Sequence, residues 1–357
     1  MKSQQLLAVI AGCLGTAVAL AQAPAAPLRQ GPGVQAANDA RYADTIAKCK
    51  VPPPRPAAGA APAGPPPAPA TVGNLTPREY TVTGIPGVIA AGAKWTTVWT
   101  TAGNNADGIV GTDDGGVLVA QNDKSQVVKI DKNGKETVVY KDTNTGGSVS
   151  INTKGQVFIA ERMLNPAIWQ LAPTKKLHAN SINGDTLDCL GGVLNDISAD
   201  SKGGVYFTMG GLFYANPKGV VTRYGENLRT NGLMLSPDEK RLYVTNATTL
   251  VAFDINADGS LANQRDFAPL EGGGGDGSAI DAAGRIYVTG AAGVHVISPE
   301  GKVLGVIPTP RGPIATAIGG PDKKTLFVVV SIRLENGRNA ELISIPLQAQ
   351  GFKGRAK

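Results

Sequence analysis

A phrase that recurs about every 40 residues is the feature that most constrains how this chain can fold. Each copy contains a short run of β-branched and aromatic residues, and the runs are Val117–Ala120, Val157–Ala160, Val205–Thr208, Leu242–Thr245, Ile286–Thr289 and Leu326–Val329. Successive runs start 40, 48, 37, 44 and 40 residues apart, which is the period of a propeller blade of four strands. Six copies predict a six-bladed β-propeller.

Composition supports an all-β fold, because 46 Gly and 25 Pro in 357 residues favour turns and short strands over helices. A further strand follows each run, for example Val127–Ile130 and Leu250–Ile255. The last copy ends before its outermost strand, so we expect Glu79–Thr83 to supply that strand and to close the ring. A solenoid of the same period is the alternative, since a period alone does not prove closure.

The N-terminal region differs in composition from the repeats. Residues 1–21 combine Lys2, an apolar stretch and Ala19-Leu20-Ala21, the pattern of a cleavable signal peptide. Residues 22–75 are rich in Ala and Pro and predict an extended linker, with a helix of about three turns over 38–50. A lipoprotein cut before Cys13 is disfavoured, because the apolar stretch before it is too short. We expect an exported protein, periplasmic or secreted, with the propeller over 76–357.

Charge and cysteine usage exclude several classes of function. The net charge is +6, but the basic residues are scattered, whereas nucleic-acid binding requires a concentrated basic stripe. No Cys-x-x-Cys motif is present, so thioredoxin-like chemistry and covalent haem attachment lack their motifs. Cys49 and Cys189 would share an oxidising compartment, and the sequence leaves their pairing open. No transmembrane helix is expected after the signal peptide, and the oligomeric state is not indicated.

The innermost strand of each blade lines the central channel, so equivalent positions at the starts of these strands converge on one axis. Counting back ten or eleven residues from each run gives the six ring positions Asp107, Gly147, Asn195, Asn231, Asp276 and Ala315. Four of them carry side-chain oxygens. Taken singly, Asn231-Gly232 and Asp276-Gly277 are also ordinary turn signals.

Two carboxylates and two amides form an oxygen-only set of ligands. Such a set suits a divalent cation, first Ca²⁺ and then Mg²⁺ or Mn²⁺. Zinc is disfavoured, because the chain has only His178 and His295 and neither occupies a ring position.

Four phrases stand in order along the chain: Asn195-Asp196, Thr230-Asn231-Gly232-Leu233-Met234-Leu235-Ser236-Pro237-Asp238, Asp276-Gly277 and Gly319-Gly320-Pro321-Asp322. These phrases resemble those of the gluconolactonase and regucalcin family of metal-dependent lactonases. The resemblance covers about residues 100–345 and implies a divalent metal, usually Ca²⁺, at the top of the channel. It assigns Asn231 and Asp276 to the metal, and Asn195 to metal-bound water or substrate.

The chain also departs from the family pattern. The Glu-Gly-Pro phrase of the first blade reads Asp107-Gly108-Ile109, so the ligand is one methylene shorter. Val193 replaces a substrate-binding Arg found in some members, while Gly147 and Ala315 offer no ligand. The shorter ligand affects metal affinity or coordination number, and the missing Arg affects whether sugar-acid lactones are the substrate. The weakened ring is also the main support for a propeller that binds without catalysis.

The function expected from these residues is metal-dependent hydrolysis of a small lactone, a cyclic ester, by a cation-activated water in the channel. Asp107, Asn195, Asn231 and Asp276 would form the metal site, Asp276 would be the general base, and Asn195 would also bind substrate. The main alternative is a non-catalytic exported propeller that binds a small molecule or protein. A quinone-dependent oxidoreductase is a third class, disfavoured because the ring shows no Arg or Lys to hold such a cofactor.

Overall fold

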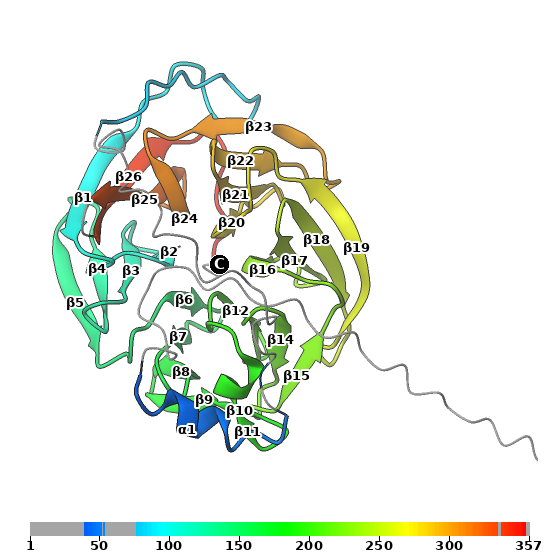
Figure 1. Cartoon of the computed structure of the whole chain (residues 1–357). Helices are drawn as coiled ribbons and strands as arrows, with labels where there is room; N and C mark the ends of the chain where they lie inside the picture. Colours follow the sequence, from blue (N-terminus) through cyan, green and yellow to red (C-terminus); the bar gives the residue numbers. More distant parts are fainter. Residues whose placement is uncertain (1–38, 52, 54–75, 335–336, 355–357) are drawn as a thin grey trace, which may run out of the picture.

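The structure, a computed structural model, describes residues 39–51, 53, 76–334 and 337–354. Six antiparallel four-stranded sheets surround a central axis as blades (Figure 1). The expected six-bladed propeller is therefore confirmed. The predicted signal peptide and nearly all of the predicted linker lie outside the described residues.

Blades one to three follow one another along the chain, each running from the channel outwards. Blade one is β2 (Ile109–Gly111), β3 (Val117–Gln121), β4 (Gln126–Ile130) and β5 (Glu136–Lys141); blade two is β6 (Ser148–Ile151), β7 (Val157–Glu161), β8 (Ala167–Ala172) and β9 (Lys176–Ala179); blade three is β12 (Ile197–Ala199), β13 (Val205–Thr208), β14 (Leu212–Ala215) and β15 (Val221–Tyr224). Between blades two and three lie the short hairpin β10 (Ser181–Ile182) and β11 (Asp185–Thr186) and the 3₁₀ helix η3 (Leu187–Leu190).

Blades four to six continue the same order. Blade four is β16 (Thr230–Leu235), β17 (Arg241–Asn246), β18 (Thr249–Ile255) and β19 (Leu261–Pro269); blade five is β20 (Ser278–Ile280), β21 (Ile286–Gly290), β22 (Gly293–Ile297) and β23 (Val303–Pro308); blade six is β24 (Gly312–Gly319), β25 (Thr325–Leu334), β26 (Gly337–Pro346) and β1 (Thr96–Ala102). Each predicted run lies in the second strand of its blade.

An N-terminal strand closes blade six, but it is a different strand from the one expected. β1 pairs antiparallel with β26, from Thr96 opposite Ser344 to Ala102 opposite Asn339. Glu79–Thr83 is not a strand. The expectation of Glu79–Thr83 as the closing strand is therefore wrong, because Val82 packs instead with Ile85, Val88 and Ile89 into the core between blades five and six.

The core is divided into six apolar layers, one between each pair of neighbouring blades. Between blades three and four, for example, Tyr206 and Tyr214 stack with ring centroids 4.4 Å apart. Strands such as β3, β7 and β13 are buried on both faces, which explains why the runs are continuously apolar rather than alternating. Packing between blades thus keeps the inner strands in place around the channel.

A repeated turn accounts for the Asp and Gly residues between strands. In blade five, Asp281 Oδ1 accepts the N–H groups of Ala283 and Arg285, and Gly284 has a φ of 79°. Asp131 and Asp200 form the same turn, with left-handed glycines at 134 and 203. The side chain replaces a backbone partner and glycine accepts the positive φ at no steric cost.

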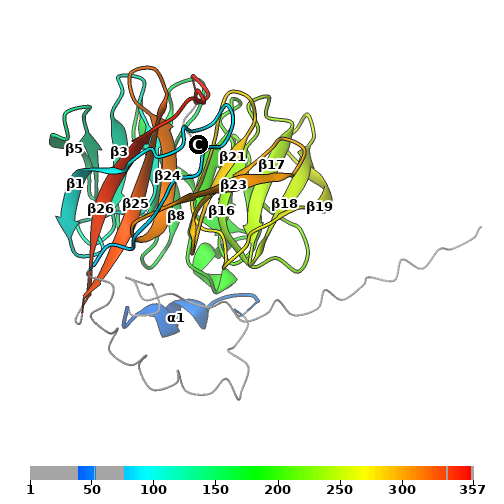
Figure 2. The same cartoon turned by 90° about the horizontal axis from the view of Figure 1, so that it is seen from above.

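The segment before the propeller contains α1 (Tyr42–Ile46), shorter than the helix expected over 38–50. None of the residues of α1 is buried. It lies below one face of the propeller, while the C-terminal segment lies at the opposite face (Figure 2). No helix among the described residues is long and apolar enough to cross a membrane.

The C-terminal segment closes one end of the channel. Gly351 forms an isolated bridge with Asp281, and Phe352 lies against inner strands β2, β20 and β24 near the axis. The starts of the inner strands, where the ring positions lie, face the other end. A ligand therefore reaches the ring positions from the face on which α1 lies.

Candidate functional site

The ring positions are structurally equivalent. The backbone N–H groups of Asp107, Gly147, Asn195 and Asp276 each donate to the carbonyl of the last residue of the predicted run in the same blade, at 2.8–3.1 Å. These acceptors are Ala120, Ala160, Thr208 and Thr289. Asn231 donates to the Thr245 hydroxyl, and Ala315 pairs with Val329. Counting back along the sequence thus identifies one layer of residues around the axis.

The glycine that follows three of these positions permits close packing of neighbouring blades. A Cβ on Gly108 would lie 2.7 Å from the Ser148 Cα, and one on Gly277 would lie 2.7 Å from the Ala315 Cα. A Cβ on Gly232 would overlap the Asp276 carbonyl. None of the three has the left-handed φ of a turn glycine. Asn-Gly and Asp-Gly at these sites are therefore packing requirements of the channel wall rather than turns.

Arg162 extends into the ring and occupies the space that a side chain at position 147 would fill if it were not glycine. A Cβ on Gly147 would overlap the Arg162 guanidinium. Arg162 is 8% exposed, and its Nε donates to the Leu194 carbonyl at 2.9 Å. Its Nη2 donates to the carbonyl and Oδ1 of Asn195, at 2.8 and 3.0 Å. The expectation that the ring contains no Arg is therefore wrong.

A polar chain runs along the ring from blade one to blade four. Arg162 forms a salt bridge with Oδ2 of Asp107, and Asn122 Nδ2 donates to that same oxygen at 3.1 Å. Asn195 Nδ2 donates to Asn231 Oδ1 at 2.8 Å. The structure thus connects Asp107, Asn195 and Asn231 through Arg162.

Asp276 follows Asn231 in the ring, on blade five, and lies in the wall of a cavity of about 410 Å³ between blades five and six. Four arginines, namely Arg78, Arg311, Arg333 and Arg338, line the same cavity. Arg311 also contacts Glu341, with 3.3 Å between Nε and Oε2. Asp276 therefore faces a strongly basic space at the open end of the channel.

The four oxygen-bearing ring residues fit a hard divalent cation in kind. Arg162 and Asn122 both contact Oδ2 of Asp107, so Oδ1 is the oxygen that a cation would use. The set contains only two carboxylates, and no cluster of three His, Cys, Asp or Glu that could hold a metal occurs in the described part of the chain. The affinity of a site for a divalent cation rises with the number of anionic ligands. Two carboxylates, one of which is paired with Arg162, therefore form a weaker site than three carboxylates would.

Sequence reasoning missed Arg162 and the arginines of the cavity. Arg162 stands two residues after the predicted run of its blade, as Asn122, Ala291 and Ser331 do in theirs. Asn122 contacts Asp107, and Ala291 and Ser331 line the cavity. Examining this second position in every blade would have found Arg162. Arg78 and Arg311 belong to connecting segments, which have no period.

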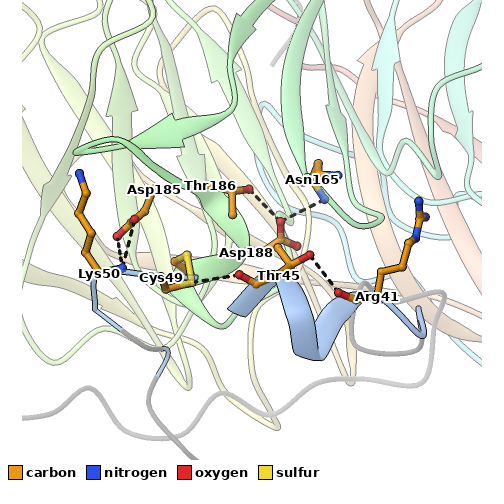
Figure 3. The surroundings of a disulfide bond; sticks show 9 residues. Arg41, Thr45, Cys49, Lys50, Asn165, Asp185, Thr186 and Asp188 are labelled. Atoms are coloured by element: carbon orange, nitrogen blue, oxygen red, sulfur yellow. Dashed lines mark hydrogen bonds between the residues drawn. A yellow bond between two sulfur atoms is a disulfide. The ribbon is translucent and has the colours of Figure 1, made fainter. Parts of the chain in front are cut away.

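The segment containing α1 is attached to the loop that precedes Asn195. Cys49 and Cys189 form a disulfide with Cα atoms 5.7 Å apart, as Figure 3 shows. The Lys50 N–H also donates to the Asp185 carboxylate at 3.1–3.2 Å. The pairing that the sequence left open is therefore present, at the channel face.

Asp188, next to this disulfide, is held by the loop itself. The Thr186 hydroxyl donates to Asp188 Oδ2 at 2.8 Å, and the Asn165 N–H donates to it at 3.1 Å (Figure 3). Burial raises the pKa of Asp188, although both hydrogen bonds act to lower it. Oδ2 of Asp188 has two donors from the neighbouring loops, whereas its buried Oδ1 has no hydrogen-bond partner among the described residues. Because both donors to Oδ2 belong to these loops, we assign Asp188 a structural role.

Two curated relatives align with parts of the chain. A gluconolactonase of Zymomonas mobilis is 29% identical over 169 residues, covering 38% of this chain and 48% of the relative. A 6-deoxy-6-sulfogluconolactonase of Pseudomonas putida is 34% identical over 139 residues, covering 37% and 47%. The chain thus spans about half the length of the curated relatives it matches.

A solved structure supports the fold over a larger part of the chain. A gluconolactonase of Xanthomonas campestris superposes with a TM-score of 0.61 at 20% identity, covering 76% of this chain and 97% of that one. The family model described as the SMP-30/Gluconolactonase/LRE-like region matches residues 147–332, which is more than half of the 357 residues. The chain belongs to the SMP-30/gluconolactonase/LRE-like family.

Proposed function

We propose that this protein is a metal-dependent lactonase, which opens a small cyclic ester at the ring of the propeller. The observation that carries the proposal is the placement of two carboxylates and two amides, Asp107, Asp276, Asn195 and Asn231, in one layer at the open end of the channel. The names of the curated relatives supply the class of substrate.

Asp276 is the proposed general base. It would take the proton of an attacking water as the water oxygen bonds to the lactone carbonyl carbon. The ring C–O bond then breaks, the leaving oxygen takes a proton, and the product is a hydroxy acid. Asn195 would orient the substrate through its amide, which Arg162 and Asn231 fix by hydrogen bonds.

Asp107, Asn231 and Asp276, with Asn195 beside them, would hold the cation, and Ca²⁺ suits an oxygen-only set best. When bound, a divalent cation polarises a carbonyl and lowers the pKa of a water molecule. The Arg162 guanidinium contacts Oδ2 of Asp107, so Oδ1 would be the oxygen of this carboxylate that holds the cation. Mg²⁺ or Mn²⁺ would be the next choices.

The test is turnover of a lactone panel that includes glucono-lactone, with metal-stripped protein and with Ca²⁺, Mg²⁺ or Mn²⁺ restored. Asp276→Asn should reduce kcat by about 100-fold or more, since general bases contribute about 10²–10⁴-fold. Asp258→Asn, in an exposed turn, is the matched control. Cation binding without turnover of any lactone would reject the enzyme and favour the non-catalytic binding module.

We also propose export to the periplasm or the cell exterior. The supporting observations are the signal-peptide pattern of residues 1–21 and the Cys49–Cys189 disulfide, a bond that persists in oxidising compartments. Fractionation of cells that express the full chain tests this directly. Recovery in the cytosol with both thiols free would refute it.

A further inference from the structure

The cavity beside Asp276 carries more positive charge than its own acidic groups balance. Among the residues that the structure describes, its lining contains four arginines and one carboxylate, a formal sum of +3 for these five side chains. Asp276 belongs to the lining, and Glu341 contacts Arg311. With Glu341 included, two carboxylates oppose four guanidinium groups, and the formal charge of these six side chains is +2.

Arg78 is fixed by carbonyl groups rather than by an acid. Its Nη1 donates to the Ala291 carbonyl at 3.0 Å, and its Nη2 donates to the carbonyls of Thr309 and Arg311 at 3.1 Å. These bonds hold the guanidinium in place without neutralising its charge. Arg78 is therefore a positively charged group with a fixed position in the wall of the cavity. Such a guanidinium loses little conformational entropy when it binds a ligand.

Arg333 and Arg338 lie directly opposite each other on β25 and β26. Directly opposed residues of an antiparallel pair project from the same face of the sheet, and like charges there are destabilising. Neither arginine forms a salt bridge with a residue of the described part of the chain. An anion between the two guanidinium groups would remove the repulsion and gain charge-assisted hydrogen bonds.

We propose that this cavity binds an oxyanion substituent of the substrate, a carboxylate, sulfonate or phosphate, with Arg333 and Arg338 as its principal ligands and Arg78 and Arg311 behind them. The substrate class is then an acidic lactone, whose charged group occupies the cavity while its ester lies near Asp276. The identity of the ester rests on the lactonase function proposed above, but the anion site stands on its own residues.

The first experiment measures binding without catalysis. Inorganic sulfate is titrated calorimetrically into the full chain and into Arg333→Met, Arg338→Met and, as a charge-matched control, Arg223→Met in the outer strand of blade three. Sulfate should bind the parent, and loss of either cavity arginine should weaken it about 10- to 100-fold. Arg223→Met should bind as the parent does. No binding to the parent, or equal binding by Arg333→Met, overturns the anion site.

The second experiment measures specificity. The ratio of kcat/KM for a carboxylated sugar lactone to that for neutral glucono-lactone should exceed about 10 in the parent and fall at least tenfold in Arg333→Met. If the ratio is the same in both proteins, the anion site does not select substrate and the acidic-lactone assignment is wrong. If no lactone is hydrolysed, the lactonase proposal fails and the sulfate titration alone decides the anion site.

Discussion

Replacement of Gly147 by Ala should remove Arg162 from the ring. The three heavy atoms nearest to a Cβ at Gly147 all belong to the Arg162 guanidinium, and Gly147 has no left-handed φ that would strain an alanine. The new methyl group and the guanidinium cannot occupy the same space. The side chain would have to leave Asp107 and its acceptors at residues 194 and 195.

The size of the effect follows from burial. Breaking a buried ion pair costs about 3–5 kcal/mol, whereas an exposed pair contributes about 0–1 kcal/mol. The Arg162 and Asp107 side chains are 9% and 22% exposed, so we expect about 2–3 kcal/mol for Gly147→Ala and a similar loss for Arg162→Ala. With Arg162 already shortened, Gly147→Ala should be neutral or stabilising by about 0.5 kcal/mol.

The assay is a double-mutant cycle on the free energy of unfolding, measured in urea. The two substitutions should show an interaction energy of about 2–3 kcal/mol, because each removes the same contacts. Because the positive charge of Arg162 opposes a cation at Asp107, the same variants should raise the affinity for Ca²⁺ in a calorimetric titration. Costs that add within about 0.5 kcal/mol would refute the placement of Arg162 against Gly147.

Three further predictions concern stability and the attached segment. Burial raises the pKa of Glu161 to about 7. The free energy of unfolding is therefore highest below the usual carboxyl pKa and falls as pH rises to 7, by up to about 3 kcal/mol. Glu161→Gln should flatten this pH profile, measured by urea unfolding. Gly277→Ala would place its Cβ 2.7 Å from the Ala315 backbone and should cost about 1–3 kcal/mol. Gly312→Ala, which meets nothing within 4 Å, should change thermal unfolding little, and equal effects of the two substitutions would contradict the close packing of the inner strands. Cys49→Ser should make the segment around α1 sensitive to trypsin and leave propeller unfolding within about 1 kcal/mol, because α1 buries no residue; an unchanged digestion pattern would show that non-covalent contacts suffice to hold it.

The parts of the fold that follow a period were predictable. Packing between blades buries the second strand of each blade, so its apolar run repeats at a nearly constant interval. The closing strand has no such signal, since Glu79–Thr83 and Thr96–Ala102 both contain β-branched residues. Which of them pairs depends on the apolar side chains of residues 82–89, which insert between blades five and six.

The ring could be predicted from the sequence, but its electrostatics could not. Ring residues keep a fixed offset from each run because their N–H groups bond to its last carbonyl. Arg162 reaches the ring with a long side chain from another position, and only the space at Gly147 admits it. The basic cavity brings together Arg78 and Arg338, which are 260 residues apart in the sequence. No local sequence pattern indicates that these two arginines lie close together.

The closing strand also determines when the molecule can become complete. β1 forms its antiparallel hydrogen bonds with β26, and Thr96 pairs with Ser344, which lies 248 residues further along the chain. During synthesis from the N-terminus, β1 therefore waits with an unpaired edge until the last repeat has been made, and pairing over such a distance folds slowly. The first five blades can form in order, whereas the continuous ring that brings Asp107 into one layer with Asp276 exists only after this final step. A chain that stops before β26 would have five complete blades and only the two inner strands of the sixth, with β1 unpaired and the ring open.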